Sequence, residues 1–148
     1  MGFLSGMDIS GSALTAQRLR MDIIAENIAN VETTRTEDGG PYRRKRVIME
    51  PRNPDFAETL QQRISGDPKA SVAGGVRVTG IVEDQSDFKL KYDPTHPDAD
   101  ENGYVQMPNV DLTLEMVDMI SAYRSYQANV TAFNAYKDMA VRALEIGK

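Results

Sequence analysis

The segment Asp98–Gly103, DADENG, is the part of the sequence that comes nearest to a metal site. An EF-hand calcium loop needs oxygen ligands at positions 1, 3 and 5 and glycine at position 6, which this chain matches with Asp98, Asp100, Asn102 and Gly103. Position 12 requires a bidentate Glu but is Asn109, and prolines in residues 93–97 prevent an entering helix. The pattern therefore favours an acidic surface turn. A calcium-dependent binding module through residues 98–109 is the alternative function.

Side chains that could catalyse hydrolysis are present, but they do not form a recognisable motif. His96 is the only histidine and lies between two prolines, so it fits a rigid loop better than a catalytic base. Glu83 and Asp84 are paired acids of the kind that glycosidases use, which makes a cell-wall-acting enzyme the less favoured alternative. The absence of cysteine excludes thiol nucleophiles and cysteine-ligated metals. We expect no enzymatic activity, no catalytic residue, no cofactor and no metal site.

Four consecutive basic residues, 43–46, are the strongest charge cluster in the sequence. A net charge of −5 argues against general nucleic-acid binding, which requires a clustered basic surface. In a strand, alternate residues point to opposite faces, so the cluster would not make a single basic patch. Two interpretations stay open: protection of an edge strand by charge, and a contact with an acidic neighbouring subunit.

The elements that must position these side chains begin with a long N-terminal helix, predicted over residues 3–31. Its seam is apolar at intervals of seven residues, with Met7, Leu14, Met21 and Ile28. Gly6 and Gly11 lower the helix propensity of the first turns by roughly 1 kcal/mol each. The first third of this helix should therefore be marginal by itself.

A second long helix is predicted at the C-terminal end. Asp111 can cap its N-terminus, Glu115 suits its first turn, and Gly147 can end it. Its apolar stripe has spacings of three and four residues and includes Leu112, Met116, Met119, Tyr123, Tyr126, Val130 and Phe133.

The middle of the chain has the turns and alternating patterns of a small β-rich region. We expect a loop over residues 32–41, strands within 42–50, 76–81 and 88–92, a short helix inside 51–75, and turns over 93–109. The predicted fold class is α+β, mainly α. Long terminal helices pack as a coiled-coil-like hairpin and carry a β-rich central insert. The predicted domains are residues 1–31 with 109–148, the helical assembly domain, and residues 32–108, the insert.

Two long helices that pack along one side of each other leave other apolar surface uncovered. Soluble monomers rarely expose large apolar surfaces. The stripes therefore predict that the chain lives in an oligomer or that its ends order when a partner binds. Asn27 and Asn30, near the end of the first helix, are expected to donate or accept hydrogen bonds with a loop or neighbouring helix. The competing explanation for Asn30 is a left-handed helix end, and the two are compatible.

Four segments carry a resemblance to a known family: residues 13–36, 39–47, 92–111 and 115–130. The first, ALTAQRLRMDIIAENIANVETTRT, resembles the N-terminal signature of the bacterial flagellar rod and hook axial proteins, and the others narrow the resemblance to the proximal rod. The resemblance implies a non-enzymatic subunit of the basal-body rod, the drive shaft of motility. Its helical ends would line the tube as coiled coils, and residues 51–75 depart from the family pattern.

The resemblance also implies partners and a location. The partners would be the rod proteins FlgB, FlgF and FlgG, the rod base protein FliE, further copies of the chain, and the flagellar type III export apparatus. The location would be the periplasmic rod of the basal body. The N-terminus lacks the pattern of a cleaved signal peptide, and no apolar run has transmembrane length. Neither nucleic acid nor a membrane span is expected.

The predicted assembly interface combines the seams of both helices with the two asparagines. It consists of Met7, Leu14, Met21, Ile24, Asn27, Ile28, Asn30, Val31, Met116, Met119, Tyr123, Tyr126, Val130 and Phe133.

Overall fold

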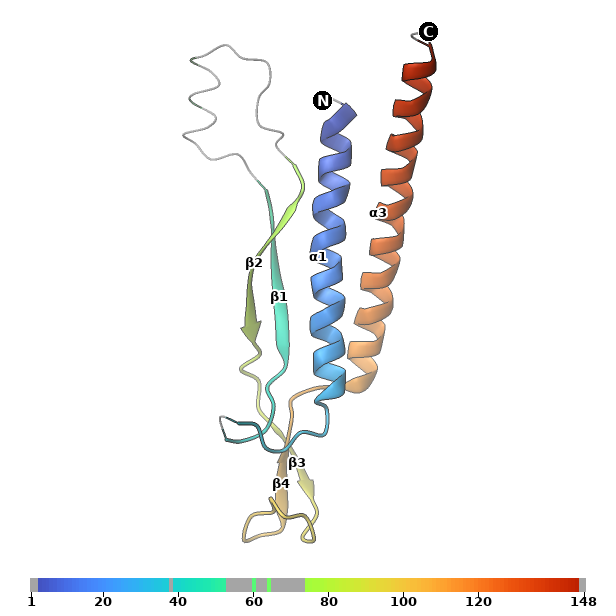
Figure 1. Cartoon of the computed structure of the whole chain (residues 1–148). Helices are drawn as coiled ribbons and strands as arrows, with labels where there is room; N and C mark the ends of the chain where they lie inside the picture. Colours follow the sequence, from blue (N-terminus) through green and yellow to red (C-terminus); the bar gives the residue numbers. More distant parts are fainter. Residues whose placement is uncertain (1–2, 38, 53–59, 61–63, 65–73, 147–148) are drawn as a thin grey trace. The chain divides into compact units, whose positions relative to one another are not determined.

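A computed structural model describes residues 3–37, 39–52, 60, 64 and 74–146. Within these residues the chain has a long helix at each end and two small two-stranded sheets between them (Figure 1). The predicted α+β class with mainly helical content is confirmed. The elements in chain order are α1 (Phe3–Ala29), β1 (Lys45–Pro51), β2 (Val76–Glu83), β3 (Lys89–Tyr92), β4 (Tyr104–Met107) and α3 (Leu112–Ile146).

Helix α1 ends at Ala29, two residues before the predicted boundary. Asn30 closes the last turn, since its backbone N–H and its side-chain Nδ2 both donate to the carbonyl of Glu26, at 3.1 and 2.9 Å. Its Oδ1 accepts a hydrogen bond from the Thr33 hydroxyl at 3.1 Å. No described residue other than glycine has a positive φ, so a left-handed helix end at Asn30 is wrong. The side chain, and not an unusual backbone angle, ends this helix.

Strands β1 and β2 form one sheet, and β3 and β4 form an antiparallel pair in which Tyr92 faces Tyr104. The strands predicted within 42–50, 76–81 and 88–92 are confirmed. Strand β4 falls in the segment predicted as turns. Its four residues are too few to show the alternation from which a strand is predicted. The short helix expected inside 51–75 lies outside the described residues, apart from positions 60 and 64.

Helix α3 begins where the sequence predicted. The carboxylate of Asp111 accepts hydrogen bonds from the backbone N–H groups of Thr113 and Leu114, at 3.0 and 3.3 Å. These bonds satisfy two donors that the first turn of a helix leaves without a partner. Neither described helix has an apolar stretch long enough to cross a membrane.

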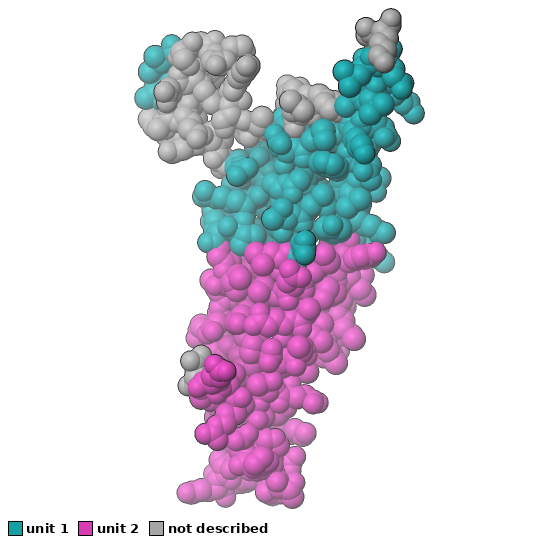
Figure 2. Space-filling model, in the orientation of Figure 1, with its two compact units in different colours: residues 1–18, 49–79, 124–148 teal, residues 19–48, 80–123 magenta. Residues whose placement is uncertain are grey.

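The chain divides into two compact units (Figure 2). Unit 1 contains residues 1–18, 49–79 and 124–148, and unit 2 contains residues 19–48 and 80–123. Among the described residues, the buried ones of unit 1 are Ser5, Ser10 and Ala16. The buried residues of unit 2 include larger apolar and polar side chains: Ile23, Ile24, Asn27, Tyr42, Val105, Pro108, Val110, Glu115 and Ala122. The predicted helical domain and insert are a different division and stay a prediction.

Candidate functional site

Asn27 lies at the centre of a buried set of polar contacts in unit 2. Its Nδ2 donates to the backbone carbonyl of Lys45 at 2.9 Å and to Oε2 of Glu115 at 3.1 Å. Its Oδ1 accepts from the backbone N–H of Lys45 at 2.9 Å and from the Tyr42 hydroxyl at 3.0 Å. Two donors and two acceptor positions are all that an Asn side chain offers, so its hydrogen-bonding capacity is filled. The prediction that this amide makes hydrogen bonds to a loop or a neighbouring helix is confirmed, since Tyr42 lies in a loop and Glu115 in α3.

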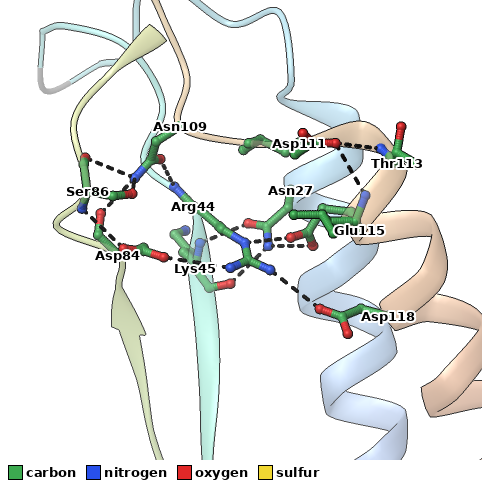
Figure 3. Close-up of polar contacts among 12 residues, drawn as sticks. Asn27, Arg44, Lys45, Asp84, Ser86, Asn109, Asp111, Thr113, Glu115 and Asp118 are labelled. Carbon is green, nitrogen blue, oxygen red and sulfur yellow. Dashed lines mark hydrogen bonds and ion pairs between the residues drawn. The ribbon is translucent and has the colours of Figure 1, made fainter.

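Glu115 is the second centre of the set, and its side chain is only 1% exposed. Nε of Arg44 lies 2.5 Å from Oε1 of Glu115, while Asn27 bonds the other carboxylate oxygen (Figure 3). A buried carboxylate is costly unless it is paired and hydrogen-bonded, and here both oxygens have a partner. The guanidinium of Arg44 also reaches Asp84 at 3.6 Å and Asp118 at 3.5 Å.

Asn109 connects the same set to the segment before α3 (Figure 3). Its Oδ1 accepts from the backbone N–H of Arg44 at 2.8 Å, and its Nδ2 donates to the carbonyl of Asp84 and the hydroxyl of Ser86, both at 2.9 Å. Hydrogen bonds from the backbone N–H and then the hydroxyl of Ser86 lower the pKa of the Asp84 carboxyl below its ordinary value. Asp84 therefore stays ionised beside Arg44, which is a structural role and not that of a proton donor.

We call Asn27, Tyr42, Arg44, Asn109 and Glu115 the polar node. Burial, followed by the charges of Glu26 and Glu115, raises the pKa of the Tyr42 hydroxyl well above its ordinary value. The hydroxyl therefore stays protonated and donates a hydrogen bond to Oδ1 of Asn27. All five residues belong to unit 2, and their partners tie the end of α1, the start of β1 and the first turn of α3 to one another. The arrangement holds three segments of chain in a fixed relation.

The basic residues 43–46 have roles that neither sequence interpretation anticipated. Arg44 pairs with Glu115, the guanidinium of Arg43 lies 4.3 Å from the centre of the Phe88 ring, and Nζ of Lys45 lies 2.6 Å from Oε1 of Glu26. These contacts are made within unit 2. Most of the cluster thus stabilises its own chain.

The acidic segment 98–103 is held as a turn by its own side chains. Oδ1 of Asp100 accepts from the backbone N–H groups of Asn102 and Tyr104, at 2.9 and 2.8 Å. Oδ2 of Asp98 accepts from the Thr34 hydroxyl at 2.8 Å. Gly103 has a φ of 80°, a conformation that glycine adopts without strain. These hydrogen bonds give the acidic residues a structural role, which is to form the turn. Over the described part of the chain, no cluster of three or more ligand-type side chains could hold a metal.

One side of the first three turns of α3 is apolar and open to solvent. Leu112, Met116, Ile120 and Tyr123 follow each other at spacings of four, four and three residues, which places them on one face. The last three are each 53% exposed. Glu115 and Ala122, on another face of the same turns, are buried in unit 2. We call Leu112, Met116, Ile120 and Tyr123 the open face of α3.

The structure places the residues of the predicted assembly interface in three environments. Ile24 and Asn27 are buried, while Met116 and Tyr123 are exposed. The others are half-buried: Met7, Leu14, Met21, Ile28, Asn30, Val31, Met119, Tyr126, Val130 and Phe133. All hydrogen-bonding positions of the Asn27 side chain are occupied by residues of its own chain. The two exposed residues have the surface that an interface needs, and the interface as a whole stays a prediction.

The sequence interpretation missed Tyr42, Arg44, Asn109 and Glu115 as a connected group. Arg44 and Glu115 are 71 residues apart, and no periodic pattern relates them. A signal was nevertheless present, since each of these residues lies in one of the four segments that resemble the axial proteins. The three-dimensional structure shows that those segments meet at the polar node.

The comparisons with known proteins agree with this resemblance. Residues 7–35 match the family model "Flagella basal body rod protein", and residues 101–146 match "Flagellar basal body rod FlgEFG protein C-terminal". The chain is similar to the flagellar basal-body rod protein FlgC of Bacillus subtilis (strain 168), with 52% identity over 96% of each chain. It is 51% identical to FlgC of Borreliella burgdorferi, over 99% of this chain and 98% of the relative. FlgC of Salmonella typhimurium is 41% identical over both full lengths.

Proposed function

This chain belongs to the FlgC family of flagellar basal-body rod proteins, and from that premise we propose that it joins the proximal rod through its terminal helices. It is a structural subunit of the flagellar basal body, not an enzyme, and it associates with other rod components. The proposal concerns the finer description: which surface makes the contacts, which neighbours it meets and how the subunit reaches its place.

The open face of α3 is the observation that carries the proposal. Four large apolar side chains lie on one face within twelve residues, and this stretch has no charged residue on that face. A soluble monomer rarely exposes a contiguous apolar surface of this kind. A neighbouring rod subunit that covers it with an apolar helix would remove it from water, and each buried side chain would contribute roughly 1.5–3 kcal/mol.

Repeated copies of such a contact build a rod when the surfaces that meet are different on the two partners. Heterologous contacts that do not close into a ring generate an open helical filament. We propose that the predicted interface residues of α1 and α3 supply these surfaces, with residues 1–31 and 109–148 as the assembly domain. The other rod proteins FlgB, FlgF and FlgG and the base protein FliE are the proposed neighbours.

The proposed location is the part of the rod that crosses the periplasm, as the drive shaft of the motor. The proposed route is the flagellar type III export apparatus, without a cleaved signal peptide. Support for this route comes from the family, whose members are rod proteins of the flagellar basal body.

The test is a matched pair of charge substitutions on adjacent residues of α3. In a motile strain whose only copy carries Ile120→Asp, we expect loss of swimming and absence of the subunit from purified basal bodies, because the interface would bury an unpaired charge. Ser121→Asp, at an exposed polar position, should swim normally. Normal rods with Ile120→Asp would refute the open face as an interface. Circular dichroism of both purified variants checks that their helices are retained.

A further inference from the structure

The polar node lies wholly in unit 2, and we infer that it is a positioning device that folds before assembly. We propose that residues 19–48 and 80–123 are already folded in the isolated subunit, and that the node presents the open face of α3 as a preformed docking surface. The apolar helix of a neighbouring rod subunit would be the occupant. This occupant rests on the proposed function, whereas the folding of unit 2 before assembly does not.

The contacts of the node are complete without a second chain. All four hydrogen-bonding positions of Asn27 are filled by Tyr42, Lys45 and Glu115. Both carboxylate oxygens of Glu115 are bonded by residues of the same unit, and Arg44 has further acidic neighbours there. A buried polar group needs its partner whenever it is removed from water. Because the partners are all present within unit 2, the isolated chain can form the node without a neighbour.

The node also determines which side of α3 meets solvent. Glu115 is fixed from two directions, by Arg44 from the start of β1 and by Asn27 from α1. Fixing this one side chain sets the rotation of the first turns of α3 about the helix axis. Met116, the next residue, and Leu112, Ile120 and Tyr123 then face away from the buried side. Buried ion pairs add little net stability compared with apolar residues, but they can specify one arrangement.

A preformed docking surface lowers the cost of assembly. Ordering a residue costs backbone entropy, and a segment that is already helical does not lose this entropy when it binds. Among the described residues, the buried side chains of unit 1 are the small ones of Ser5, Ser10 and Ala16, and Met139, Val141 and Leu144 on its part of α3 are about half exposed or more. We therefore place the boundary between preformed and assembly-ordered helix near residues 18 and 124.

Hydrogen exchange of the purified full-length chain, followed by mass spectrometry, tests the inference. We expect slow exchange in residues 19–29 and 112–123, and exchange at least about tenfold faster in residues 3–18 and 124–146. Equal exchange along each helix, whether slow or fast, would overturn the inference. The proposed rod contact is tested separately by Ile120→Asp, so its failure would leave this result unchanged.

A matched pair of arginine substitutions tests the node itself. Arg44→Ala should raise exchange in residues 112–123 by about tenfold or more, because it leaves the buried carboxylate of Glu115 without its cation. Arg46→Ala removes the same charge from an exposed position and should change nothing. Arg44→Lys should restore part of the protection, since it keeps the charge but not the planar fork of donors.

Exchange at the β3–β4 pair shows whether the variant is still folded. If Arg44→Ala left residues 112–123 protected, or if Arg46→Ala exposed them equally, the node would not be the positioning device. If Arg44→Ala also exposed residues 89–92 and 104–107, the partial recovery with Arg44→Lys would decide. Recovery of protection in both segments would support the positioning role of the node, and absence of recovery would contradict it.

Discussion

Units 1 and 2 contain successive stretches of the same two helices, but they hold them with different kinds of contact. In unit 2, buried side chains with charges and amides bond one another, and Asn27 and Glu115 are each only 1% exposed. In unit 1, the buried side chains among the described residues are the small ones of Ser5, Ser10 and Ala16, and glycines lie against Tyr136 and Ser12. The packing of one helix can therefore be determined by polar pairing along one part of its length and by steric fit along another.

Gly6 and Gly75 show how steric fit operates in unit 1. A Cβ atom added to Gly6 would lie 2.5 Å from Cζ of Tyr136, so this glycine permits α1 and α3 to approach within unit 1. Gly75 has a φ of 97° and lies against Ser12, whose hydroxyl accepts the backbone N–H of Val76 at 3.0 Å. The sequence interpretation treated Gly6 only as a weak helix former, whereas the structure shows a packing reason for it.

Polar satisfaction also differs between the units. In unit 1 the side-chain oxygen Oε1 of Gln17 is buried and has no hydrogen-bond partner among the described residues. A buried acceptor without a partner costs about 1–3 kcal/mol relative to one that is bonded. A neighbouring subunit that supplied a donor would remove this cost, which agrees with unit 1 becoming ordered during assembly.

Removing the central amide of unit 2 should have the largest effect. Asn27→Leu is nearly equal in size but leaves Tyr42, Glu115 and the backbone groups of Lys45 without their partner. We expect the free energy of unfolding to fall by about 3–5 kcal/mol, because several buried polar groups lose hydrogen bonds together. Urea denaturation measures this loss. Asn30→Leu, in the next turn and half-buried, is the control and should cost much less.

Two glycine substitutions in α1 should separate steric fit from helix propensity. Gly11 has no atom within 4 Å of an added Cβ, so Gly11→Ala should gain up to about 1 kcal/mol of helix propensity. Gly6→Leu should instead cost about 1–3 kcal/mol in the assembled rod, where unit 1 is ordered, through overpacking against Tyr136. If unit 1 orders during assembly, rod incorporation will fall with Gly6→Leu while the urea midpoint of the isolated chain stays the same. A large midpoint shift in the isolated chain would contradict the difference between the units.

The sequence predicted those parts of the fold that depend on local pattern. The helix α1, the Asp111 cap of α3 and the strand β3 are predicted from patterns within a few residues, and the structure confirms each of them. The polar node depends on chain segments that meet from far apart. A glutamate in the first turn of a helix ordinarily faces water and the helix dipole, so nothing near Glu115 in the sequence indicated its burial.

The same reasoning explains the misassigned residues in the middle of the chain. Strand β4 has four residues and gains its structure from pairing with β3, which local propensity cannot show. The two interpretations of residues 43–46, protection of an edge strand and contact with a neighbouring subunit, did not include pairing within the chain, because the acidic partners Glu26, Glu115 and Asp118 lie elsewhere in the sequence. Three residues of the open face of α3, Leu112, Met116 and Tyr123, belong to the predicted stripe, whereas Ile120 does not.

The smallest effect should come from the cap of α3, at the edge of unit 2. Asp111→Ala removes the acceptor of the Thr113 and Leu114 backbone N–H groups, and we expect Tm to fall by no more than about 4 °C. Asp111→Asn is the matched control, because Asn is an equally good cap, and most of the stability should return.

The pH dependence of this effect follows from the same hydrogen bonds. The backbone N–H groups of Leu114 and then Thr113 lower the pKa of the Asp111 carboxyl from its ordinary value of 3.8. The unfolded chain therefore binds this proton more readily than the folded chain does. The contribution of the charged cap is complete above pH 3.8 and is lost as the pH falls through the lower pKa of the folded state. The Tm difference between the wild type and Asp111→Asn should consequently shrink below pH 3.8. A difference that instead grew on acidification would show that the charge at Asp111 does not stabilise the start of α3.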